Sequence, residues 1–189
     1  ALIAALASYD PGDPSINTAA RTIPQNWMGL PGAWIADLMI QSIGLASWLI
    51  GPVFIAWGWR LLAHRGLGRV WLRITATPVA LLLATMGLSV LPPSVGWPLG
   101  AGLGGVTGDI LLADMVALLA GINVSASVIG GIAGIGAAIA GVTAMGLSSR
   151  EWRGMAHGFG GIARVILFRG RQSVDMGLKA ADAGGQVLQ

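Results

Sequence analysis

The 189-residue sequence has no cysteine and few charged side chains. Without cysteine there are no disulfide bonds and no thiolate metal ligands, and cysteine usage gives no information about the redox compartment. Charged residues make up 10% of the chain, whereas an ordinary soluble domain has about 25%. Because 54% of the residues are hydrophobic and the mean hydropathy is +0.74, a soluble core of this length could not hide the apolar surface. We therefore expect lipid to be the solvent.

Two uncharged stretches have the length of single transmembrane helices. The first covers residues 38–59, which are 22 residues, and it contains Pro52, where we expect a kink rather than a break. The second covers residues 74–91, which are 18 residues, and it ends at the Pro92–Pro93 pair. Both stretches predict complete spans.

A third uncharged stretch, residues 115–149, is too long for one crossing, since its 35 residues would make a helix of about 52 Å. Gly121 and Asn123 are typical of a helix end followed by a new helix start. The sequence therefore predicts a short interfacial or re-entrant helix over residues 109–120 and a third complete span over residues 125–147.

The two ends of the chain differ from these spans. Residues 1–8 are apolar but cover only about 12 Å, so we interpret them as the end of a truncated first span; a signal-peptide remnant is the alternative. Residues 150–189 are basic, with apolar residues at helical spacing, and predict a cytoplasmic amphipathic helix followed by the start of a linker. Residues 1–149 then form the transmembrane anchor domain, and the fold class is all-α and polytopic, with interfacial helices.

The charges are divided unequally between the two sides that these spans define. One side has a single base among six charged residues, and the other has ten Arg or Lys residues against three acids. Basic loops of membrane proteins stay in the cytoplasm. The pattern therefore predicts an inner-membrane, multi-pass protein with a cytoplasmic C-terminus, in contact with membrane lipid.

No catalytic, cofactor or metal site is predicted. The glycines at residues 100–105 match a dinucleotide-binding pattern by letter, but prolines surround them and no β-α-β unit precedes them. His64 and His157 lack further ligands at metal-binding spacing. Nucleic-acid binding by this segment is disfavoured, because the bases lie beside predicted spans and are not interleaved with stacking aromatics.

The last predicted span contains a row of small residues, Gly130, Gly134 and Ala138, with a parallel Ser127–Gly131 pair. Small residues four apart let helices approach closely in lipid. We expect this row to be a helix-packing face, whose partner is either another helix of the chain or a neighbouring protomer.

Two motifs on the predicted external side are specific: YDPGDPS at residues 9–15 and NWMGLPGAWIAD at residues 26–37. With the WGWR exit at residues 57–60, they closely resemble the N-terminal four-helix membrane domain of FtsK/SpoIIIE-type DNA translocases, especially those of alphaproteobacteria. The resemblance covers nearly the whole chain. Ile16 is a small departure, since many relatives have an aromatic residue there.

The resemblance implies a membrane anchor and assembly domain, located at the division septum and tethering a hexameric, ATP-driven motor that moves chromosomal DNA. ATP and Mg would bind only in that motor, and the chain contacts DNA only through it. Similar domains contact other division proteins, and the external loop is our candidate surface for this. Its candidate residues are Asp10, Asp13, Asn17, Arg21 and Asn26.

A different class of function stays open. The chain could be a self-contained integral-membrane accessory subunit or a small transporter. Transport is disfavoured because the predicted spans lack ionisable residues, although Asn123 beside a broken helix is a feature that a binding site could use.

Overall fold

The computed structural model describes residues 1–147, except residues 17, 20–21, 65, 94 and 98. Within this part every regular element is a helix and no strand occurs. The predicted C-terminal amphipathic helix and linker, residues 150–189, lie outside the described residues. The elements are α1 Leu2–Ala7, α2 Gly29–Ile43, η1 Gly44–Leu49, α3 Ile50–Leu62, α4 Val70–Leu88, α5 Gly105–Leu118, η2 Ala120–Ile122 and α6 Ala126–Met145.

Three helical stretches are long and apolar enough to cross a membrane by length and composition. They are Gly29–Leu62, which joins α2, η1 and α3, then Val70–Leu88 and Ala126–Met145. The prediction of an all-α fold with three long apolar helices is confirmed.

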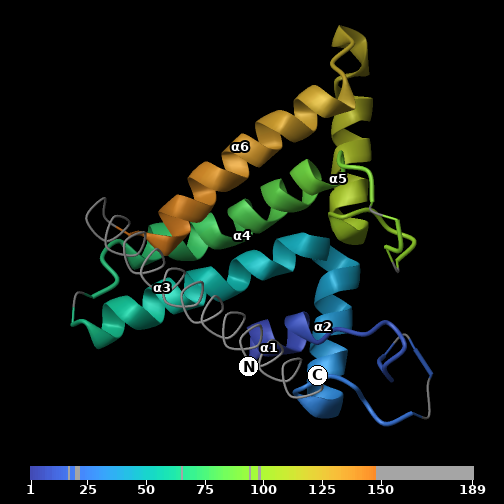
Figure 1. Cartoon of the computed structure of the whole chain (residues 1–189). Coiled ribbons are helices and arrows are strands. Elements are labelled where there is room, and N and C mark those ends of the chain that lie inside the picture. The colour runs from blue at the N-terminus through green and yellow to red at the C-terminus, as the bar shows by residue number, and fades with distance from the viewer. Residues whose placement is uncertain (17, 20–21, 65, 94, 98, 148–189) are drawn as a thin grey trace, which may run out of the picture. The chain divides into compact units, whose positions relative to one another are not determined.

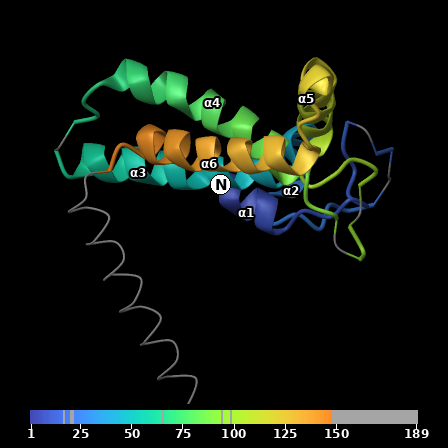
Figure 2. The same ribbon diagram turned by 90° about the horizontal axis from the view of Figure 1, so that it is seen from above.

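Helices α3, α4 and α6 run alongside one another, and α2 and α5 run across this direction at one end (Figures 1 and 2). Small side chains line the contacts between the three parallel helices. One buried cluster joins Ala46, Ala84 and Ala137, and the other joins Val53, Ala76 and Ala144. Alanine at these positions lets the helix backbones approach closely.

The bend in the first long stretch lies at Gly44 and not at Pro52, so the predicted kink is wrong. Gly44 ends α2 with φ 58° and ψ −143°, a conformation that only glycine adopts without strain. Its backbone packs directly against Leu103, whose carbonyl accepts a hydrogen bond from the Leu45 amide at 2.9 Å. Pro52 lies in the first turn of α3, where a proline needs no amide donor. The helix axis therefore turns at the glycine.

The connection between α5 and α6 falls in the segment that contains Gly121 and Asn123. Helix α5 begins at Gly105, four residues before the expected start, and ends at Leu118. Asn123 then takes a left-handed conformation with φ 52°, which asparagine tolerates better than most residues. Ser125 occupies the N-cap position of α6, without a side-chain capping bond.

Large apolar side chains cover much of the outside of this bundle. On α6 the exposed residues include Ile132, Ile135 and Ile139, each about two-thirds exposed, while the buried positions are mostly glycine and alanine. A soluble helix would show the opposite pattern. The distribution fits a lipid-facing surface around a core of small residues.

Candidate functional site

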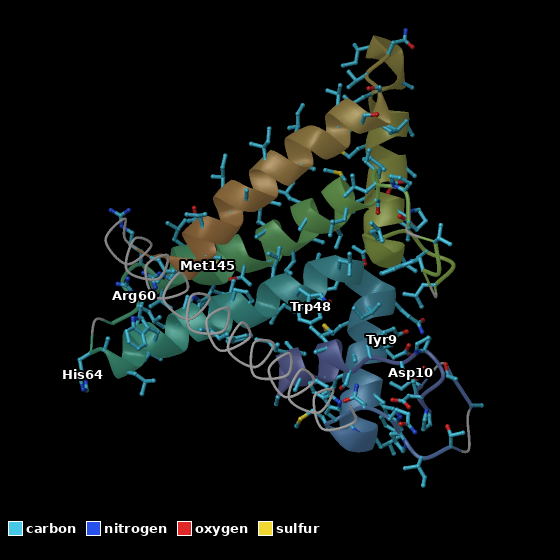
Figure 3. The ribbon with its side chains drawn as sticks, viewed as in Figure 1. Tyr9, Asp10, Trp48, Arg60, His64 and Met145 are labelled. Atoms are coloured by element: carbon cyan, nitrogen blue, oxygen red, sulfur yellow. The ribbon has the colours of Figure 1, made fainter. Side chains whose placement is uncertain are left out.

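Acidic and basic residues lie at opposite ends of the parallel helices. Arg60 and His64 lie at one end, where α3 ends and α4 begins, and Tyr9 and Asp10 lie toward the other (Figure 3). The predicted external and cytoplasmic residues are therefore separated along the direction of the helices.

The base of the predicted external loop is fixed by two buried polar residues. The Asp13 carboxylate accepts hydrogen bonds from the amides of Gln25 at 2.7 Å and Asn26 at 2.9 Å. The Asn26 side chain donates to the carbonyls of Ala5 at 2.8 Å and Ser8 at 3.1 Å, at the end of α1. These bonds hold the two ends of the loop together beside α1.

The five predicted interaction residues therefore differ in role. Asp13 and Asn26 are buried, and their polar atoms are used within the chain. Asp10 is exposed, and its carboxylate accepts a hydrogen bond from the Gly12 amide at 2.7 Å in a local turn. Asn17 and Arg21 lie outside the described residues. Among the described three, only Asp10 presents its side chain at the surface.

A second polar group connects the loop to α2. Asp37 is buried, and its Oδ1 accepts hydrogen bonds from the Tyr9 hydroxyl at 3.1 Å and the Gln41 side-chain amide at 2.8 Å. Burial, together with the negative charges of Asp37 and Asp10, raises the pKa of Tyr9. Tyr9 therefore stays protonated at physiological pH and keeps donating to Asp37.

At the basic end, three side chains bind the C-terminus of α6. The Trp57 indole N–H donates to the Ala144 carbonyl at 2.8 Å. Arg60 and Arg73 both donate to the Gly146 carbonyl, at 3.0 and 3.1 Å. Carbonyls at a helix C-terminus have no partners within the helix, and the helix dipole favours cations there. The arginines therefore join α3, α4 and α6 where the described chain ends.

The predicted packing row of α6 is only partly used inside the chain. Gly130 is buried and packs directly against the side chain of Val90. Gly134 and Ala138 are exposed, and a Cβ added at Gly134 would meet no atom within 4 Å. The backbone of Gly134 nevertheless packs closely against Gly87 of α4. The buried α6 residues are Ile129, Gly130, Ala133, Ala137, Gly141 and Ala144.

Sequence reasoning missed a close crossing between α4 and the start of α5. Gly104, the N-cap of α5, and Gly108 in its first turn pack directly against the Thr85 carbonyl of α4 and the hydroxyl of Ser89, the C-cap of α4. Any larger residue at either glycine would overlap these atoms. The four-residue spacing is visible in the sequence, but the glycine and proline content of the segment before residue 109 favours a loop.

The described residues contain no group of three or more His, Cys, Asp or Glu side chains that could hold a metal ion. Asp109 instead accepts a hydrogen bond from the Gly102 amide at 2.8 Å and so stabilises the turn before α5. The polar residues identified here thus connect helices and loops to one another.

Sequence comparison identifies proteins similar to this chain. One family, described as the 4TM region of DNA translocase FtsK/SpoIIIE, matches residues 1–160. The chain is 37% identical over 110 residues to the DNA translocase FtsK of Agrobacterium fabrum, which is 58% of this chain and 12% of that protein. It is 35% identical over 153 residues to the DNA translocase FtsK of Azospirillum brasilense, covering 80% of this chain and 24% of that protein.

A third relative, the DNA translocase FtsK of Caulobacter vibrioides, is 35% identical over 145 residues, which is 72% of this chain and 18% of that protein. The chain thus spans less than a quarter of the length of these relatives. No solved structure matches it.

Proposed function

The chain belongs to the family of 4TM regions of FtsK/SpoIIIE DNA translocases, and we propose that it anchors such a translocase in the bacterial inner membrane at the division septum. In this role it tethers an ATP-driven motor that moves chromosomal DNA. The 189 residues contain no Walker A sequence, so the ATPase chemistry is assigned to the motor and not to this segment.

One observation carries the proposal: α3, α4 and α6, each part of a long apolar helical stretch, lie side by side, with acidic residues toward one end and basic residues at the other. The polar side chains found at the two ends hold helices and loops together. An arrangement of this kind fixes a chain in a bilayer and leaves both ends available for other contacts.

The crossing part of the first stretch is residues 44–62 in this proposal. Helix α3 alone has 13 residues, about 20 Å, which is too short for the roughly 30 Å hydrocarbon core. The six residues of η1 lead directly into α3 and add about 12 Å. Helix α2, which runs across the bundle (Figure 1), then lies at the membrane surface.

The basic end faces the cytoplasm in this proposal, because positively charged loops are retained there. Arg60, Arg69 and Arg73 lie at or near this end, whereas Asp10, Asp13 and Asp37 lie on the side of the external loop. The same orientation places the C-terminus, and the linker to a motor, in the cytoplasm.

Self-association is part of the proposal, with a hexamer expected by resemblance. The outer side of α6 supports it, since Gly131, Gly134 and Ala138 are exposed and would let a neighbouring helix approach closely. Contact with other division proteins is assigned to the external loop, with Asp10, Asn17 and Arg21 as the candidate residues.

The test uses the full-length translocase in cells. Deletion of residues 1–147 should move the protein from the membrane fraction to the soluble fraction, while the ATPase activity of the purified protein persists. Replacing the same residues with unrelated transmembrane helices should restore membrane attachment without septal localisation. Septal localisation of that chimaera would show that the chain supplies attachment only.

The alternative, a self-contained accessory subunit or transporter, is distinguished by the reading frame after Gln189. A linker followed by a P-loop motor supports the anchor. A stop codon close to Gln189 would overturn it.

A further inference from the structure

A cavity of about 340 Å³ lies between α2, α5 and the loop that follows α1. Its walls combine apolar and polar side chains from α2, with one residue each from α5 and the loop. The lining includes Trp34, Asp37, Leu38, Gln41 and Val106.

The carboxylate of Asp37 gives this cavity its charge. Asp37 is only 6% exposed, and both of its hydrogen bonds within the described part of the chain go to Oδ1, from Tyr9 and Gln41. Both donors are neutral, so they do not compensate the negative charge. A buried carboxylate is costly unless a cation accompanies it. The cavity therefore favours a positively charged ligand.

The surroundings of Asp37 restrict the kind of cation. Trp34 lies in the cavity wall, and the face of an indole ring attracts ammonium groups. Leu38 and Val106 also line the cavity and are about half exposed, which suits a ligand with an apolar part beside its charge. A hydrated metal ion matches neither feature.

The position of the cavity indicates where this ligand comes from. Helices α2 and α5 run across the ends of the proposed spans (Figures 1 and 2), at the depth of lipid headgroups if the membrane placement proposed above holds. A lipid headgroup there can direct its ammonium group inward while its acyl chains stay in the bilayer.

We propose that the cavity binds the ethanolamine headgroup of phosphatidylethanolamine, with the ammonium group at the Asp37 carboxylate and against Trp34. A primary ammonium has three N–H donors for the carboxylate. The trimethylammonium group of phosphatidylcholine has none and is bulkier, so the site discriminates between the two lipids.

The test measures lipid retention by native mass spectrometry. The purified chain in detergent receives equal amounts of phosphatidylethanolamine and phosphatidylcholine with acyl chains of distinguishable mass. We expect one phosphatidylethanolamine to be retained with a preference on the order of fivefold, as about one extra charge-assisted hydrogen bond would give. Asp37→Asn should remove the preference, whereas Asp10→Asn, at an exposed acid, should leave it unchanged.

A second variant guards against a folding effect of Asp37→Asn. Val106 lines the cavity from α5 and is not a hydrogen-bond partner of Asp37, so Val106→Trp adds bulk to the cavity wall and should also remove the preference. Equal retention of the two lipids by the unaltered chain, or an unchanged preference in both cavity variants, would overturn the proposal. The proposal would also be overturned by a double-mutant cycle in which the effects of Asp37→Asn and Arg21→Gln on stability are fully coupled. Arg21 would then neutralise the Asp37 carboxylate within the chain. Membrane fractionation of the same variants tests the anchor separately.

Discussion

Gly44 has a backbone conformation that a side chain would strain, and its Cβ position is occupied by the backbone at Leu103–Gly105. Gly44→Ala should therefore lower the free energy of unfolding by about 1 to 3 kcal/mol from the backbone alone, with a further loss from the overlap. Thermal unfolding in detergent, followed by circular dichroism, measures this.

Gly58 provides the matched control. It lies within α3, and a Cβ there meets no atom within 4 Å. Because alanine is the better helix former, Gly58→Ala should be neutral or slightly stabilising. Equal effects of the two variants would show that the bend at Gly44 does not depend on glycine.

Asp13 is the residue whose loss should release the predicted external loop. Asp13→Ala leaves the amides of Gln25 and Asn26 without their carboxylate acceptor, which should cost about 1 to 3 kcal/mol. Limited proteolysis should then cut the loop faster.

Asp10→Ala serves as the comparison, since this acid is exposed and its carboxylate accepts a hydrogen bond from the Gly12 amide in a local turn. It should leave the cleavage rate unchanged. If septal recruitment is lost in Asp10→Ala with the loop intact, the loop surface itself is the contact. Recruitment lost only in Asp13→Ala would indicate a folding effect.

At the scale of elements, α6 has two sides with different roles. Gly130→Ile places a branched side chain where Val90 already lies, and overpacking of this kind costs about 1 to 3 kcal/mol. At Gly134 an added Cβ would meet no atom within 4 Å, because only the backbone of this residue packs against Gly87 of α4. Gly134→Ile should leave thermal unfolding unchanged and reduce assembly of the detergent-solubilised protein, measured by size-exclusion chromatography with light scattering. An unchanged elution profile for Gly134→Ile would count against a protomer contact there.

An element can be predicted from the sequence when local composition determines it, and not when a contact with a distant part of the chain determines it. Helices α4 and α6 were expected from the absence of charge, and the expected ranges, 74–91 and 125–147, differ from Val70–Leu88 and Ala126–Met145 by one to four residues. Lack of charge is a local property that follows from contact with lipid, so it can be read along the chain.

The bend at Gly44 could not be predicted in the same way. It depends on a contact with Leu103, far along the chain, and nothing local distinguishes Gly44 from Gly51 or Gly58. Pro52 carried the stronger local signal, yet its position in the first turn of α3 cancels its effect. The α4–α5 crossing at Gly104 and Gly108 was missed for a related reason, since a glycine-rich segment predicts a loop until its packing partner is known.

The candidate site was predictable at the level of regions and not of residues. The loop motifs correctly indicated the family, but only the hydrogen bonds show that Asp13 and Asn26 hold the loop together rather than face a partner. Asp37 was counted only as an external charge, because its burial comes from the packing of α1, α2 and the loop.

At the scale of the whole molecule, orientation follows from the separation of charge. Because the chain has no cysteine, single cysteines can be introduced at Gln25, His64, Ala120 and Arg171 without background. In intact cells a membrane-impermeant maleimide should label the cysteines at residues 25 and 120, while those at 64 and 171 react only after permeabilisation. The opposite orientation would place the Arg and Lys residues of the basic end outside the cytoplasm. This would cost on the order of several kcal/mol of free energy for the whole group, because positively charged loops are retained in the cytoplasm. The proposal has two crossings, α4 and α6, between residues 64 and 171, so both cysteines should react from the same side. If they were labelled from opposite sides, the number of crossings between them would be odd, and the proposed tether to a cytoplasmic motor would fail.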